Sequence, residues 1–187
     1  MRLSSGVRFS VFQVVLMYVL VLSACAVKTE VKETSVSDLR GNLKYENIIF
    51  KEFCTTSNTA TYNSQLTQCQ ASAMSYLQAK DLFKRVEMDS GSSYEEPCLL
   101  VEVTLTGCKI VSTKRRVFTG VFSGRSYMTM EVKLIDSSND VLIAEKHLKG
   151  APSAMGSAWS FGKSDRALPE KMGALIGDFI LSNVAEQ

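Results

Sequence analysis

Histidine is almost absent from this chain of 187 residues, which contains only His147. A single histidine excludes multi-histidine metal centres and leaves any histidine-based catalytic scheme one candidate. Three prolines and eleven glycines are too few for a collagen-like or proline-rich low-complexity chain. The formal net charge of +2 is too small to indicate nucleic-acid binding, so no nucleic-acid partner is expected. Hydrophobic residues make up 45% of the chain, which is enough to bury one globular core.

The N-terminal segment has the pattern of an export signal. Arg2 and Arg8 precede an apolar run of about fourteen residues, at positions 9–22. A membrane-spanning helix needs about twenty apolar residues, so the run fits the hydrophobic region of a signal peptide better. We therefore predict a signal peptide over residues 1–24. It can belong to a lipoprotein precursor, or it can be an ordinary secretory signal or an uncleaved anchor.

The predicted signal ends in Leu22-Ser23-Ala24-Cys25. This tetrapeptide resembles the lipobox of bacterial lipoprotein precursors, in which small residues admit the segment to the signal peptidase and the cysteine thiol carries the lipid. The resemblance implies that Cys25 is lipidated and that its acyl chains hold the protein on a membrane. Residue 26 is alanine rather than the aspartate that often retains lipoproteins in the inner membrane. The implied address is the cell envelope, on the periplasmic face, with the outer membrane favoured over the inner.

Removal of the signal would leave a charge-balanced chain. Of the 21 basic residues, Arg2 and Arg8 would be lost, which leaves 19 against 19 acidic residues. Residues 25–43 are polar and lack periodicity, so we expect a lipidated N-terminus followed by a flexible tether. Residues 44–187 are expected to form one periplasmic domain.

The domain is expected to belong to the α+β class. Alternating apolar and polar residues, or short apolar runs, predict strands at 45–53, 82–88, 98–111, 125–136 and 141–148. A helix beginning at Asn63 or Ser64 is expected to reach Lys80, and a closing helix has Pro169 in its first turn. Asp136 is expected to accept backbone N–H groups in the turn at 137–140. The order β-α-β-β-β-β-α predicts a single domain with a mainly antiparallel sheet and helices packed on it.

Four cysteines remain besides the one in the predicted lipobox: Cys54, Cys69, Cys98 and Cys108. An even number favours disulfides in an oxidising periplasm. If residues 98–111 form one strand, its two cysteines lie about 30 Å apart, too far to be bridged. Pairing of Cys54 with Cys69 or with Cys98 is therefore preferred, and buried free thiols are the alternative. The spacings contain no C-x-x-C motif, so no metal is expected, and no cofactor either.

The stretch from 99 to 150 combines a hydrophobic strand with the basic pair Arg115-Arg116 and two glycines, Gly120 and Gly124. A long alternating strand ending in Asp136, a turn and a second strand ending near residue 150 follow. This pattern resembles domain of unknown function family 4410, small bacterial envelope proteins of which many are lipoproteins. The family usually has a glycine in the turn where this chain has Ser137-Ser138-Asn139-Asp140. The resemblance implies a fold and an envelope setting but no chemistry.

Two features are candidates for binding a partner. Lys114-Arg115-Arg116 is the densest basic run, and we expect it either to contact lipid headgroups, lipopolysaccharide phosphates or an acidic partner, or to be a solvated loop. Trp159 and Phe161 lie in a loop of small residues, where they can form a docking spot or plug a satellite core. The glycines at 120–124 do not match the spacing of a phosphate-binding loop, so a glycine-rich connection between strands is expected there.

The sequence offers no second histidine, no activated nucleophile and no convincing pair of carboxylates, so an enzyme is not expected. The predicted function is a membrane-anchored, non-catalytic binding or assembly component with an envelope protein as partner. One alternative is a subunit of an oligomeric secretion channel, in which residues 117–128 would form inter-subunit or membrane-proximal strands. The other is a small-molecule or glycan-binding module that uses Trp159 and Phe161.

Overall fold

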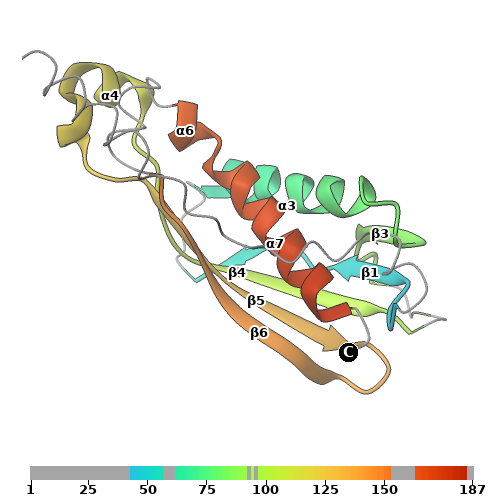
Figure 1. Ribbon diagram of the computed structural model, residues 1–187. Coiled ribbons are helices and arrows are strands. Elements are labelled where there is room, and N and C mark those ends of the chain that lie inside the picture. The colour runs from blue at the N-terminus through green and yellow to red at the C-terminus, as the bar shows by residue number, and fades with distance from the viewer. Residues whose placement is uncertain (1–42, 57–61, 92–93, 95–96, 153–162, 185–187) are drawn as a thin grey trace, which may run out of the picture. The chain divides into compact units, whose positions relative to one another are not determined.

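A six-stranded sheet forms the centre of the computed structural model, which describes residues 43–56, 62–91, 94, 97–152 and 163–184 (Figure 1). The strands are β1 (Asn47–Phe50), β2 (Cys54–Thr55), β3 (Arg85–Met88), β4 (Leu99–Lys109), β5 (Tyr127–Asp136) and β6 (Val141–Gly150). The helices are α3 (Asn63–Gln78), α4 (Thr113–Thr119), the 3-10 helix η2 (Gly120–Ser123), α6 (Lys163–Arg166) and α7 (Leu168–Val184). The predicted α+β class, with one domain, is confirmed.

The sheet has the order β3-β1-β4-β5-β6, and β2 pairs with β4 off this path. Antiparallel ladders join β4 to β5 and β5 to β6, which are the three longest strands, so the sheet is mainly antiparallel as predicted. The short strands β1, β2 and β3 pair in parallel. All four residues of β1 are buried, because this strand lies between two others and is covered on both faces.

The core lies between one face of the sheet and the helices α3 and α7. Alternate residues of β4 and β5 point to this face, because successive side chains of a strand project to opposite sides. The strands contribute Leu99, Val101, Val103, Leu105, Met128, Met130, Val132 and Leu134. The helices contribute Leu66, Cys69, Ala73, Leu77, Met172, Ile176, Phe179 and Ile180. The strands and the two helices therefore share one core, whereas Leu175 of α7 is 40% exposed.

Two glycines allow α7 to lie directly against α3. A Cβ atom at Gly173 would stand 2.5 Å from the carbonyl oxygen of Cys69 and 2.7 Å from the backbone nitrogen of Ala73. A Cβ atom at Gly177 would collide with the ring of Tyr76. The spacing of four residues places both glycines on one side of α7, so the helix backbones can approach more closely than any larger residue permits.

The connection from β4 to β5 differs from the prediction. Residues 113–123 form α4 and η2, whereas the sequence predicted a glycine-rich loop there and, in the channel alternative, strands over 117–128. Ser112 begins α4 as an N-cap whose side chain accepts a hydrogen bond from the backbone N–H of Arg115. The first helix also departs in detail, because α3 begins without a side-chain cap from Asn63 or Ser64.

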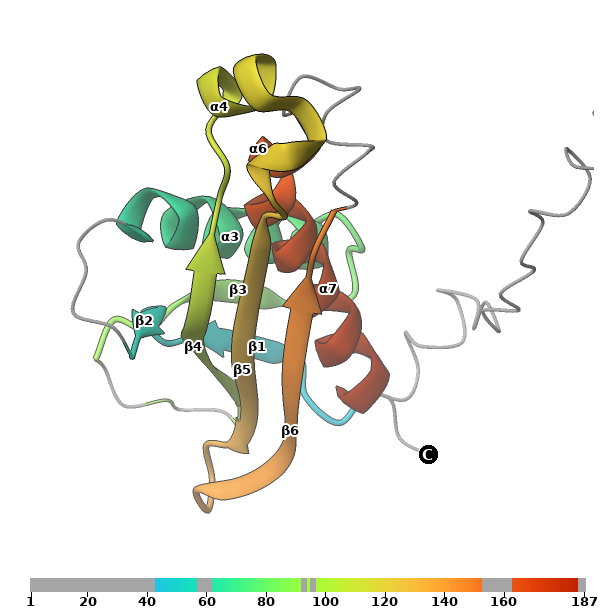
Figure 2. The ribbon, with the colours of Figure 1, turned by 90° about the vertical axis from the view of Figure 1, so that its left-hand side faces the viewer.

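Figure 2 shows α4 and α6 at one end of the strands β4, β5 and β6, with the β5–β6 hairpin at the other end. In the part of the chain that the structure describes, no helix combines the length and apolar character needed to cross a membrane. The predicted signal peptide, Cys25 and most of the predicted tether lie outside the described residues.

Candidate functional site

The most unusual surface of the domain is formed by α4 and η2, residues 113–123, which we call the α4–η2 cap. The cap leaves the sheet at the end of β4 and returns to it at the start of β5. At its base the backbone N–H of Val111 donates to the buried hydroxyl of Ser126 at 2.9 Å, which ties the incoming segment to the outgoing one. The two segments that connect the cap to the sheet are thus hydrogen-bonded to each other.

A buried ion pair holds the cap against α6. The guanidinium of Arg116 donates to both carboxylate oxygens of Asp165, with Nε–Oδ2 at 2.7 Å and Nη2–Oδ1 at 3.1 Å. Its third nitrogen, Nη1, donates to the carbonyl oxygen of Gly124 at 2.8 Å. Both charged side chains are 0% exposed, so the pair is desolvated and its geometry is fixed by a bidentate contact. Arg116 therefore fastens the cap to a helix that lies 49 residues later in the chain.

Apolar side chains cover the outer side of the cap. Phe118 is 85% exposed and Phe122 is 91% exposed, and Val117 and Val121 beside them are also exposed. Single exposed apolar residues are ordinary in soluble domains, whereas here four lie within six residues of sequence. No other large hydrophobic residue of the described part is more exposed than these two phenylalanines.

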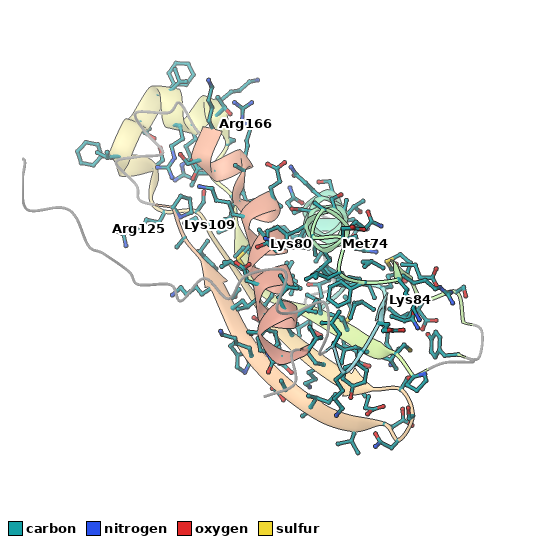
Figure 3. All side chains as sticks on the ribbon, turned by 45° about the vertical axis from the view of Figure 1, so that its right-hand side comes forward. Met74, Lys80, Lys84, Lys109, Arg125 and Arg166 are labelled. Atoms are coloured by element: carbon teal, nitrogen blue, oxygen red, sulfur yellow. The ribbon has the colours of Figure 1, made fainter. Side chains whose placement is uncertain are left out.

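Basic residues surround this apolar surface. Lys114 and Arg115 are exposed on α4, and Lys109 and Arg125 are exposed on the segments that enter and leave the cap. Figure 3 shows Lys109, Arg125 and Arg166 on the side of the domain that carries the cap, and Lys84 on the opposite side. Residues 103–130 contain no aspartate or glutamate. The cap therefore combines exposed aromatic rings with basic side chains and has no acidic residue in its own stretch of sequence.

The structure divides the predicted partner-binding residues. Arg115 is exposed on the cap, where a contact residue would lie. Arg116 is 2% exposed, which corrects its predicted place in a partner-facing or solvated basic run. Trp159, Phe161 and Cys25 lie outside the described residues. The sequence analysis missed the exposed phenylalanines of the cap, although the long run without acidic residues was a visible signal.

All four described cysteines are free thiols in the structure, which agrees with the free-thiol alternative and leaves the predicted disulfides unconfirmed. Cys69 faces the main core from α3, whereas Cys98 lies in a small second cluster with Ile49 and Leu100. Cys54 is exposed, with its sulfur 3.7 Å from the carbonyl oxygen of Val103. Burial raises the pKa of the Cys69 thiol to about 12, so this thiol is unreactive at neutral pH.

One cluster of possible metal ligands lies on the open face of the sheet. Register places Glu131 of β5 opposite His147 of β6, and Glu145 joins them so that one ligand atom of each lies within 4.8 Å of the others. Glu131 forms an ion pair with Lys133 at 2.7 Å, and the imidazole is largely exposed. An exposed, already paired group of this kind is the ordinary arrangement of charges on a solvated strand.

Two tyrosine hydroxyls connect distant elements through carboxylates. Tyr45 donates to Asp136 at 2.7 Å, and Tyr76 of α3 donates to Asp178 of α7. The hydrogen bond to Asp178, assisted by burial, raises the pKa of Tyr76 to about 12. Asp136 also accepts the backbone N–H of Ser138, as predicted for the turn, and this bond is the main cause that lowers the pKa of its carboxyl. These hydrogen bonds link the start of the domain to the β5–β6 turn and α3 to α7.

A surface hollow of about 260 Å³ lies beside the start of the described domain, lined by Leu43, Lys44, Glu46, Asn47 and Pro97. Glu46 forms an ion pair with Lys84. The lining contains no cysteine, histidine or hydroxyl group, and its ionisable residues are Lys44 and Glu46.

The fold is similar to that of solved bacterial proteins at low sequence identity. A PelC variant dodecamer from Paraburkholderia phytofirmans is 13% identical, with a TM-score of 0.52, and the alignment covers 78% of this chain and 92% of that one. A second PelC dodecamer from the same organism is 12% identical, with a TM-score of 0.50 and coverage of 76% and 90%. The hypothetical protein CT253 from Chlamydia trachomatis is 10% identical, with a TM-score of 0.48 and coverage of 74% and 97%. At these identities the likeness to PelC concerns the fold alone.

The sequence itself matches one family and no curated protein. The model of a domain of unknown function, DUF4410, matches residues 29–157. The match takes in every strand of the sheet and the whole α4–η2 cap, and it ends before α7. The sequence resemblance noted over residues 99–150 is therefore confirmed and extended, and the chain belongs to the DUF4410 family.

Proposed function

We propose that this protein is a non-catalytic component of the bacterial cell envelope, anchored to a membrane by lipid on Cys25, that acts by contact with another envelope component. The α4–η2 cap is the observation that carries the proposal. A domain that fixes two exposed phenylalanines in place with a desolvated ion pair is built to present a surface. Among the described residues, the groups with raised pKa values are thiols, tyrosines and the two ion-paired lysines Lys51 and Lys133. They are spread over several elements rather than gathered at one site.

The anchor is supported by the sequence at residues 1–25. The basic start, the short apolar run and the lipobox-like Leu22-Ser23-Ala24-Cys25 occur in the order that bacterial lipoprotein precursors have. Two or more acyl chains hold a protein on a bilayer stably, whereas one binds only marginally. Alanine at residue 26 favours the outer membrane as the site of the anchor.

Metabolic labelling with a fatty-acid analogue tests the anchor directly. Cells expressing the full precursor should incorporate the label into this protein, and Cys25→Ser should abolish it. Cys54→Ser is the matched control, because it removes an exposed thiol of the described domain and should leave the label unchanged. Equal labelling of the two variants, or no labelling of the parent chain, would refute the anchor.

A subunit of an oligomeric envelope assembly is the second candidate. It is favoured by the fold likeness to PelC, whose structures are dodecamers. Residues 117–123 are helical, so the assembly would not use the inter-subunit strands that the sequence alone suggested. Native mass spectrometry of the mature chain, in detergent and in lipid nanodiscs, should show a defined oligomer. A monomer in both would exclude this candidate and leave the first intact.

A further inference from the structure

We propose that the α4–η2 cap is a second membrane-contact site, which places Phe118 and Phe122 in the interfacial layer of an anionic phospholipid bilayer. The site is distinct from the lipid on Cys25, because it belongs to the folded domain and needs no covalent modification. Its biological setting rests on the proposed envelope location, whereas its chemistry rests on the cap alone.

The cap buries two polar residues where an ordinary helix of a soluble domain buries apolar ones. Arg116 is 2% exposed, and Ser123 is 3% exposed with its hydroxyl bonded to the carbonyl oxygen of Gly120 at 2.8 Å, whereas Lys114, Arg115 and Thr119 are exposed. Its largest apolar residues point outward, on either side of the turn at residue 120. Burial of apolar surface normally stabilises a fold, so apolar side chains held outward in this way point to contact with an apolar surface outside the domain.

Charge indicates what kind of phase this is. The acid-free stretch from 103 to 130 carries five basic residues, and only one of them, Arg116, is neutralised by Asp165. Lys109, Lys114, Arg115 and Arg125 remain exposed, and none has an ion-pair partner among the residues that the structure describes. Aromatic rings surrounded by basic side chains are the pattern that binds the interface of an anionic bilayer.

A second copy of the chain does not fit this surface as well. Two caps meeting face to face would bring eight exposed cations together at a desolvated contact, and like charges at an interface disfavour association. A bilayer supplies the opposite charge at its phosphates and apolar depth just below them. It also needs no matching shape, which suits side chains that stand clear of the domain surface.

The ion pair beneath the cap makes the contact rigid. Because Arg116 and Asp165 fix α4 relative to α6, the two rings are presented without the entropy loss of ordering a flexible loop at the membrane. A domain resting on the bilayer at this end has its strands β4, β5 and β6 running away from the surface. The β5–β6 hairpin then lies about 30 Å from the cap, since β5 has ten residues.

Quenching by brominated lipids tests the proposal on the mature chain with its native N-terminus. Both test proteins carry Trp159→Phe, so that one tryptophan reports. The first adds Phe122→Trp in the cap, and the matched control adds Val141→Trp, an exposed apolar position (52%) at the distant hairpin. Each is mixed with vesicles of phosphatidylcholine and phosphatidylglycerol with brominated acyl chains, and separately with vesicles of brominated phosphatidylcholine alone.

The expected result is loss of emission intensity and a blue shift for the Phe122→Trp protein in the anionic vesicles, with neither change in the Val141→Trp protein. Adding Lys114→Gln or Arg115→Gln should lower the ratio of inserted to free cap by about fivefold each. Absence of quenching in the cap, or equal quenching at both positions, would overturn the proposal. A blue shift in the cap without bromine quenching would also overturn it, because it would show burial against protein.

Intact mass of the same samples separates this inference from the proposed anchor. A chain without acyl groups whose cap is still quenched would refute the anchor and retain the membrane-contact site. An acylated chain whose cap is not quenched would support the anchor and refute the membrane-contact site.

Discussion

Removing one partner of the buried Arg116–Asp165 pair should destabilise the domain far more than removing both. In the parent chain both side chains of the pair are 0% exposed. In Arg116→Met the Asp165 carboxylate stays in this buried site and loses two hydrogen bonds from the guanidinium. Breaking a buried pair in this way costs about 3–5 kcal/mol. The Gly124 carbonyl also loses its bond from Nη1, which adds about 1–3 kcal/mol if no water replaces it.

The double variant Arg116→Met/Asp165→Leu removes both charges and refills the space with apolar atoms. Because the desolvation of two ions offsets most of their attraction, we expect its free energy of unfolding to lie within about 2 kcal/mol of the parent value. The coupling free energy between Arg116 and Asp165, measured by the double-mutant cycle of these variants, should therefore be large. The partly exposed pair Lys51–Glu102, at 2.6 Å with 40% and 36% side-chain exposure, is the matched control, and its coupling free energy should be about 0–1 kcal/mol.

Urea unfolding followed by far-ultraviolet circular dichroism gives the four free energies of each cycle by linear extrapolation. Hydrogen exchange of the backbone amides in residues 113–123 distinguishes opening of the cap from global unfolding. The reasoning would fail if Arg116→Met cost less than about 1 kcal/mol and left amide exchange in the cap unchanged. In that case the pair would be no more than a surface contact.

Three further predictions follow from the packing. Gly173→Ala should lower the free energy of unfolding by about 1–3 kcal/mol, measured by urea titration, because its methyl group would collide with the backbone of α3. A maleimide should modify Cys54 within minutes at neutral pH and leave Cys69 unmodified until urea unfolds the chain; mass spectrometry that finds either in a disulfide would contradict the free-thiol arrangement. The bond to Asp178 and burial raise the pKa of Tyr76 from its ordinary value of 10.0 to about 12. The bond therefore stabilises the fold fully below pH 10, and this stabilisation is lost as the pH rises towards 12. Tyr76→Phe should remove that alkaline loss of stability, and an unchanged pH profile would show that the bond has no such role.

Much of the sheet and both long helices were predictable from local patterns. The alternation of Val101, Val103 and Leu105 fixed which face of β4 would be buried, because a strand repeats every two residues. The stripe that includes Leu66 and Cys69 likewise fixed the buried face of α3. The choice between disulfides and free thiols was left open by the sequence, since parity and compartment do not determine whether two sulfurs meet. Cys69 and Cys98 lie in different clusters, a consequence of how α3 and β4 are placed.

The sequence by itself determined the elements whose signal is periodic, the DUF4410 pattern over 99–150, and the run of residues 103–130 without an acidic side chain. The tertiary structure decided which member of the basic run is buried. Arg116 and Arg115 are adjacent and chemically identical, and only the arrival of Asp165 beneath α4 makes one a structural residue and leaves the other at the surface. That difference depends on a contact across 49 residues, which no local pattern encodes, because the desolvated pair forms only when the whole domain has folded.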